Sequence, residues 1–232
     1  MKKPAIVLVH GFWGNASHWS NVILALSRNG YHDLYAVDNP LTSLAEDAER
    51  TRKMVTAIEG PVILVGHSYG GAVISEMGNL PNVIALVFIA AFAPDSGESP
   101  GGITQQHLPA AAANLVPDNN GYLWLKRDKF KESFCQDLSD DEALVMSVTQ
   151  KAPLAETFGH VVHSPAWKTK PSWYQISTQD RMIHPENQTL MAQRLSARGV
   201  ISLDASHASL VSRAEAVAAL IDEAARTLSC GD

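Results

Sequence analysis

The sequence has few of the features that staple small domains together or attach proteins to membranes. Only two of its 232 residues are cysteines, Cys135 and Cys230, and their separation fits neither a disulfide framework nor a zinc-ligand spacing. The longest uninterrupted apolar run covers residues 83–93, well short of the roughly 20 residues that span a bilayer. We therefore expect two free thiols and no membrane partner.

Charge is also scarce, and it is biased towards acid. Charged residues make up 18% of the chain, against about a quarter in a typical soluble domain, and the formal net charge is −6. Binding to nucleic acid needs a basic excess, so this composition disfavours it. Lys2 and Lys3 precede an apolar run that is too short for a signal peptide. We expect a cytoplasmic protein, either a monomer or a homodimer.

Apolar segments alternate with amphipathic ones over most of the chain. Buried parallel strands read as continuous apolar runs, and the sequence has six short segments of this kind, at 5–9, 34–37, 61–65, 83–91, 173–177 and 200–203. Helical patterns separate them; the one that begins at Ser43 carries a capping box with Glu46. The alternation predicts one α/β domain over 1–232, with a mostly parallel sheet of about six strands and helices on both faces.

The alternation stops between residues 95 and 170. This stretch holds a Pro/Gly cluster at 95–102, an alanine run at 110–113 and mixed charges at 126–132. Interleaved acids and bases are more typical of a solvated helix face than of a binding patch. We expect a small, mostly helical insertion into the regular fold.

The pentapeptide Gly66-His67-Ser68-Tyr69-Gly70 has the form G-x-S-x-G. It directly follows the strand predicted at 61–65 and precedes a helical pattern, which is the placement that a nucleophilic serine requires. The sharp turn would expose the Ser68 hydroxyl above the sheet, close to the positive end of the helix dipole. The alternative is a glycine-rich turn in which the serine only caps the helix.

A serine nucleophile needs a base and an acid that orients the base. His207 follows the last predicted strand, so it is placed at the carboxyl edge of the sheet, where catalytic groups gather in α/β folds. Asp180, at the end of the preceding strand, completes the chain order Ser…Asp…His. Asp95 and Asp204 remain alternative acids.

Acyl transfer also needs N–H donors for the oxyanion. The first candidate is the backbone N–H of Tyr69, after the nucleophile, and the second is that of Phe12, in the loop after the first strand, where Gly11 allows close approach. His160 and His163 have the spacing of a helical metal pair but no third ligand, so we expect no metal. Four aromatic residues are candidates for the substrate pocket: Trp13, Trp124, Phe158 and Trp167.

Together, the His10-Gly11-Phe12 loop, the Ser68 pentapeptide, Asp180 and His207 resemble the α/β-hydrolase superfamily. The loop at 10–14 is most similar to that of the plant methylesterase and hydroxynitrile lyase group and its bacterial relatives. The resemblance implies a cap formed by 95–170 and activity on small carboxylic esters. The lyases of this group carry threonine at the position of Gly11 and lysine at that of Ala208, so the residues found here favour hydrolysis.

We therefore expect a serine hydrolase that needs no cofactor and cleaves small carboxylic esters through an acyl-enzyme, with Ser68, His207 and Asp180 as its triad. Hydrolysis of lactones, amides or carbon–carbon bonds by the same triad is an alternative. A further alternative, from a different class of function, is a ligand receptor that keeps the hydrolase fold without turnover.

Overall fold

The computed structural model describes residues 3–229. Cys135 is a buried free thiol, whereas Cys230, the second cysteine considered above, lies outside the described residues. Within the described range, no helix has both the length and the apolar content that a bilayer span requires.

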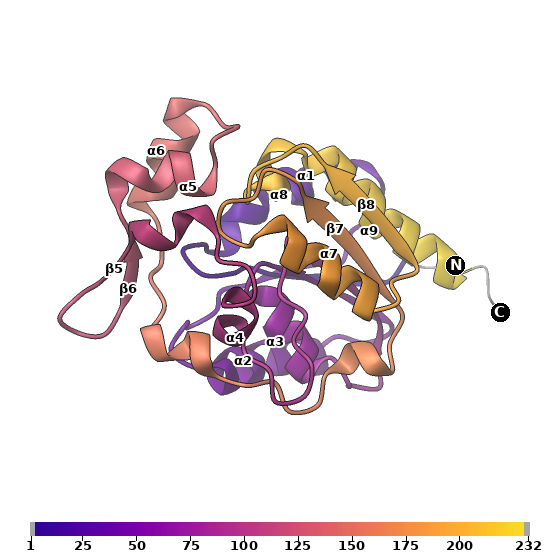
Figure 1. Ribbon diagram of the computed structural model, residues 1–232. Helices are drawn as coiled ribbons and strands as arrows, with labels where there is room; N and C mark the ends of the chain where they lie inside the picture. Colours follow the sequence, from indigo (N-terminus) through magenta and orange to yellow (C-terminus); the bar gives the residue numbers. More distant parts are fainter. Residues whose placement is uncertain (1–2, 230–232) are drawn as a thin grey trace.

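Six parallel strands form the central sheet, in the order β2-β1-β3-β4-β7-β8. Figure 1 shows the last two, β7 and β8, side by side. The bounds of the six strands are β1 (Ala5–Val9), β2 (Leu34–Val37), β3 (Val62–His67), β4 (Val83–Ile89), β7 (Ser172–Ser177) and β8 (Gly199–Leu203). These are the six apolar segments of the sequence, each shifted by no more than two residues at either end. The predicted fold class is confirmed.

Helices cover both faces of the sheet. One face carries α1 (Ser20–Arg28), the short α8 (Ser209–Ser212) and α9 (Ala214–Ser229); the other carries α2 (Leu44–Thr56), α3 (Gly70–Met77) and α7 (Pro185–Arg194). The period of two along each strand divides the apolar side chains between two cores. In β1, Ile6 and Leu8 pack toward α1 and α9, whereas Val7 and Val9 pack toward α2 and α3.

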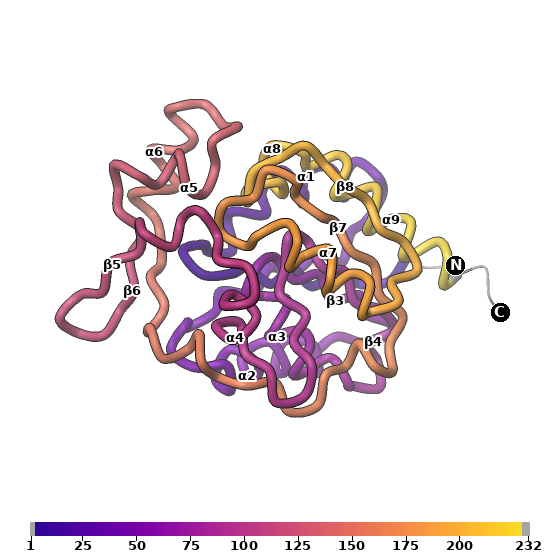
Figure 2. The backbone as a smooth tube through the Cα atoms, viewed as in Figure 1, coloured from indigo at the N-terminus to yellow at the C-terminus, as the bar shows by residue number. Residues whose placement is uncertain are grey.

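The segment between β4 and β7 leaves the sheet and packs beside its carboxyl edge (Figure 2). It consists of α4 (Pro100–Thr104), α5 (Phe130–Phe134), α6 (Asp140–Val148), the short 3-10 helices η2 (Ala110–Asn114), η3 (Arg127–Lys129), η4 (Ala155–Gly159) and η5 (Ala166–Lys168), and two strands, β5 (Leu115–Pro117) and β6 (Leu123–Leu125). A fifth 3-10 helix, η1 (Ala16–Trp19), precedes α1.

The antiparallel pair β5 and β6 is a hairpin that the sequence pattern did not predict. Its turn is held by the carboxylate of Asp118, which accepts hydrogen bonds from the N–H groups of Asn120 and Tyr122. Gly121 follows with a φ of 84°, a left-handed conformation that glycine adopts without strain. Strands of three residues are too short to establish an alternating pattern, which is why the hairpin was missed.

The turn between β3 and α3 packs directly on the end of β1. A Cβ atom at Gly70 would lie 2.2 Å from the carbonyl oxygen of Val9, and one at Gly66 would lie 2.6 Å from the carbonyl oxygen of Gly70. Both distances are far inside van der Waals contact with backbone atoms, which cannot rotate away as a side chain can. The two glycines are therefore required by close backbone approach.

This contact predicts that Gly70→Ala lowers the free energy of unfolding by about 1–3 kcal/mol, the usual cost of overpacking. Gly159→Ala is the matched control, because nothing lies within 4 Å of a Cβ atom at that position. Urea denaturation of the parent and both variants tests the prediction. Equal stability of the two variants would show that the turn can move away from β1 at little cost.

Candidate active site

Ser68 lies on the turn between β3 and α3 with a φ of 55°, in the left-handed region. A non-glycine residue in this region costs of the order of 1–3 kcal/mol, so the surrounding structure must hold it there. The N–H of Ser68 donates to the carbonyl of Ile89, and its own carbonyl accepts from the N–H groups of Gly71 and Phe92. The sharp, strained turn expected of a nucleophilic serine is present.

His207 and Asp180 form a fully buried pair. Nδ1 of His207 lies 2.7 Å from Oδ2 of Asp180, and both side chains have no exposed surface. The other ring nitrogen of His207, Nε2, is buried and has no hydrogen-bond partner among the described residues. An imidazole held through Nδ1 with Nε2 unoccupied has the orientation that a general base requires.

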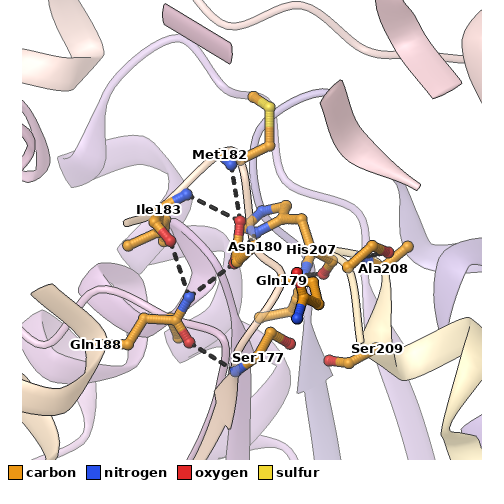
Figure 3. Close-up of polar contacts among 12 residues, drawn as sticks. Ser177, Gln179, Asp180, Met182, Ile183, Gln188, His207, Ala208 and Ser209 are labelled. Carbon is orange, nitrogen blue, oxygen red and sulfur yellow. Dashed lines mark hydrogen bonds and ion pairs between the residues drawn. The ribbon is translucent and has the colours of Figure 1, made fainter. Parts of the chain in front are cut away.

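The carboxylate of Asp180 is held by three further hydrogen bonds (Figure 3). Oδ1 accepts from the backbone N–H groups of Met182 and Ile183 at 2.7 and 3.0 Å, and Oδ2 accepts from the side-chain amide of Gln188 at 2.8 Å. The same amide nitrogen donates to the carbonyl of Ile183, and the amide oxygen accepts from the N–H of Ser177. Gln188, in the first turn of α7, had no role assigned from the sequence.

The two alternative acids do not contact the histidine. Asp95 forms an ion pair with Lys168 at the base of the insertion. Asp204 contributes a backbone carbonyl that accepts from Arg213. Of the three aspartates considered, Asp180 is the one that the fold brings to His207.

A second buried imidazole supports the first. Nε2 of His67 lies 2.8 Å from the carbonyl oxygen of His207, and the two rings are 4.7 Å apart. Burial lowers the pKa of His67 well below its usual 6.5, so the ring is neutral and donates the Nε2 proton to that carbonyl. From α5 in the insertion, Phe134 packs edge-on against the His207 ring at 4.9 Å.

The loop after β1 lies directly beside Ser68. A Cβ atom at Gly11 would be 2.5 Å from the Ser68 Cβ atom and 3.0 Å from its Oγ atom. The loop is held by His10, whose Nε2 accepts from the N–H of Asn39, so that its Nδ1 donates to the carbonyl of Gly11. This agrees with a structural, non-catalytic role for His10.

The rings of Phe12 and Tyr69 stack face to face, with centroids 3.9 Å apart and planes at 13°. Among the described residues, no hydrogen bond joins the backbone N–H of Phe12 or Tyr69 to another group, whereas the next N–H along the loop, that of Trp13, donates to Lys151. Two unused donors therefore lie on the two segments that flank Ser68.

A cavity of about 40 Å³ lies beside Ser68, which is itself only 3% exposed. Apolar side chains dominate its lining, with Thr104 as the polar exception besides Ser68: Phe12, Trp13, Phe92, Pro109, Ala111, Ala112, Leu115, Phe158 and Met182. Trp13 and Phe158, two of the four predicted pocket residues, thus line the cavity beside Ser68, and their role in binding substrate stays a prediction.

Trp124 and Trp167, the other two predicted pocket residues, do not line this cavity. The indole of Trp124 is partly exposed on the hairpin and donates to Asp118. The indole of Trp167 donates to the carbonyl of Pro94, below the guanidinium of Arg194. Their N–H groups hold the hairpin to itself and the end of the insertion to the loop after β4, so neither of these two predicted pocket residues reaches the cavity beside Ser68.

The spaced histidines of the insertion have separate partners. His160 accepts a hydrogen bond from the N–H of Leu44, whereas His163 pairs with Glu76. Within residues 3–229, no group of three or more His, Cys, Asp or Glu side chains is arranged to hold a metal ion.

Two buried histidines make the fold sensitive to acid. Burial, followed by the nearby His10 and His207, lowers the pKa of His18 from 6.5 to about 4, and burial also holds the pKa of His67 well below its usual value. Between these values the unfolded chain binds protons that the folded chain does not. The free energy of unfolding therefore falls as pH decreases from about 6.5 toward 4, by up to about 1.4 kcal/mol per pH unit for each histidine.

Urea denaturation at pH 8, 7, 6 and 5 measures this loss. His18→Gln removes one of the two titrations, so its stability should decline less steeply than that of the parent below pH 6.5, while both follow the same pH dependence above pH 7. Parallel declines below pH 6.5 would contradict the assignment to His18.

Comparison with known proteins matches residues 6–220 to the alpha/beta hydrolase family. The chain is 28% identical to the alpha/beta hydrolase nvfD of Aspergillus novofumigatus (strain IBT 16806), over 97% of this chain and 98% of that protein. It is 25% identical to Methylesterase 8 of Arabidopsis thaliana, over 88% of this chain and 82% of that protein.

Among solved structures, a pyrethroid hydrolase from Sphingobium faniae JZ-2 has a TM-score of 0.84 at 21% identity, covering 97% of this chain and 98% of the other. The similarity to a methylesterase confirms the resemblance stated from the sequence, and with it the expectation of a hydrolytic enzyme. Because the family match spans nearly the whole length, the chain belongs to the alpha/beta hydrolase family.

Proposed function

We propose that the protein is a serine hydrolase that cleaves small carboxylic esters through an acyl-enzyme. The observation that carries this proposal is the buried contact between His207 and Asp180, with Nε2 of His207 unoccupied. It is joined to the strained turn of Ser68 through the adjacent residue His67, whose ring contacts the carbonyl of His207. The names of the similar proteins, a methylesterase and a pyrethroid hydrolase, support ester chemistry.

In this mechanism, Ser68 Oγ attacks the carbonyl carbon of the ester while its proton moves to Nε2 of His207. Asp180 stabilises the imidazolium that forms and keeps the Nδ1 proton in place. The N–H groups of Phe12 and Tyr69 bind the oxyanion of the tetrahedral intermediate. His207 then protonates the leaving alcohol, and a water activated by the same imidazole releases the acid from Ser68.

The cavity limits the acyl group. It is small, about 40 Å³, and no charged side chain lines it. In this closed arrangement, the site accommodates a small, neutral acyl group against aromatic walls. Larger esters would require the insertion to move away from Ser68.

The close packing of Gly11 on Ser68 also favours hydrolysis over cyanide release. A side chain at position 11, such as the threonine of the related lyases, would meet the Ser68 Cβ atom at 2.5 Å. Mandelonitrile should therefore yield no cyanide.

Ser68→Ala is expected to reduce kcat for p-nitrophenyl acetate by about 10⁴-fold or more, as removal of a triad nucleophile does. Ser75→Ala is the matched control. Ser75 is buried like Ser68, but it lies within α3, and its hydroxyl donates to the carbonyl of Gly71. Parent-like hydrolysis by Ser68→Ala would contradict the mechanism. Labelling of Ser68 by a fluorophosphonate without any steady-state turnover would favour the alternative of a ligand receptor. A screen of esters, lactones and amides would distinguish ester hydrolysis from the alternative hydrolytic activities.

Asp180→Asn and Asp95→Asn test which aspartate orients the base. Asparagine at position 180 would hold the wrong tautomer of His207, so kcat should fall by about 10⁴-fold. Asp95→Asn breaks only the contact with Lys168 and should leave kcat within twofold of the parent. Steady-state kinetics on the same ester measures both, and the opposite order of effects would reassign the acid.

A further inference from the structure

We propose that Asp47 is a positioning residue for the oxyanion site, acting through the phenol of Tyr69. The proposal rests on the function proposed above, in which the N–H groups of Tyr69 and Phe12 bind the oxyanion. Its basis is a buried carboxylate on α2 that holds the side chain of the residue directly after the nucleophile.

Asp47 has no exposed surface, and its hydrogen bonds are to residues other than His207 and Asp180. Its Oδ2 atom accepts from the Tyr69 hydroxyl at 2.7 Å, and its Oδ1 atom accepts from the N–H of Leu41 at 2.8 Å. Burial raises the pKa of this carboxyl group, which marks the environment as poorly hydrated. Because an unpaired buried polar group is costly, these two hydrogen bonds fix both Asp47 and the groups that donate to it.

Both of its hydrogen bonds hold loops at the carboxyl edge of the sheet. Leu41 follows β2 with a φ of 64°, a conformation that its surroundings must enforce. Tyr69 begins the turn into α3. Asp47 thus connects the loop after β2 to the turn after β3 through one carboxyl group.

The Tyr69 side chain is held in two places, at its hydroxyl group and on one face of its ring. Asp47 holds the hydroxyl, and the ring of Phe12 stacks on the ring of Tyr69 at 3.9 Å. Phe158, from η4 in the insertion, packs on Phe12 at 4.5 Å. The two residues whose N–H groups are unused therefore share one rigid stack, and that stack is anchored at Asp47.

This arrangement fixes the relative position of two donors that come from separate parts of the chain. Oxyanion donors act in the transition state when they are held in place beforehand, and small displacements weaken them. Loss of the Asp47 contact should therefore lower kcat with little effect on KM, because substrate binding in the ground state does not depend on these donors.

The decisive variant is Tyr69→Phe, which removes one hydroxyl and keeps the ring stack. Tyr31→Phe is its matched control: Tyr31 is also buried, and its hydroxyl also donates to an aspartate, Asp222, at 2.9 Å, but it lies in the other core. We expect Tyr69→Phe to lower kcat about tenfold with KM within twofold, a fraction of the 10²–10³ that removal of a whole donor costs. Tyr31→Phe should lose stability without losing kcat.

A transition-state analogue separates positioning from stability. A trifluoromethyl ketone forms an oxyanion on Ser68, so its inhibition constant should rise in Tyr69→Phe by the same factor as kcat/KM falls. Asp47→Asn should reproduce both effects. A parent-like kcat and inhibition constant in folded Tyr69→Phe would overturn the proposal, whether or not Asp47→Asn folds.

The rate of Ser68 labelling by a fluorophosphonate distinguishes this failure from failure of the proposed function. If the parent is labelled but turns over no ester, the esterase proposal fails, and slower labelling of Tyr69→Phe still supports the role of Asp47, because the phosphonyl oxygen uses the same donors. Equal labelling rates in parent and variant would reject that role. A parent that neither reacts nor turns over would reject both proposals.

Discussion

The approach of the turn after β3 to the end of β1, with no side chain between them, is the constraint on which the site depends. Gly70 lies against Val9, and Gly11 lies against Ser68, each too close to admit a Cβ atom. This contact holds Ser68 at a positive φ and sets the rings of Phe12 and Tyr69 face to face. The glycines therefore act by allowing proximity, and the strain at Ser68 is the structural cost of that proximity.

Buried polar groups around this contact are paired with few exceptions. Asp180 accepts four hydrogen bonds, Asp47 accepts two, and His67 donates to the backbone of His207. An unpaired buried group costs about 1–3 kcal/mol, so this pairing preserves the fold while it fixes side-chain orientations. The exception at the centre is Nε2 of His207, the atom that would take the proton of Ser68. The small charged fraction of the chain is consistent with such an interior, in which few ionisable groups are present and those in the site have assigned partners.

Local patterns predicted the sheet and the pairing of Asp180 with His207. Continuous apolar runs identify strands buried on both faces, and parallel strands bring their carboxyl ends to one edge, so the chain order of Ser68, Asp180 and His207 was informative. Contacts set by tertiary packing were not readable in this way. The pairing of Asp47 with Tyr69 and that of Gln188 with Asp180 each join separate elements. Trp124 and Trp167 were placed in the pocket on residue type alone, which does not fix the direction of a side chain in an irregular segment.

The contact between Phe134 and His207 has a consequence for hydration. Phe134 belongs to the insertion, yet it forms one wall around the imidazole of His207. A movement of the insertion that admits a bulky substrate would also remove that wall and let water reach the imidazole. Under the proposed mechanism, one aromatic ring would therefore couple access to the site with the dielectric environment of the proton transfer.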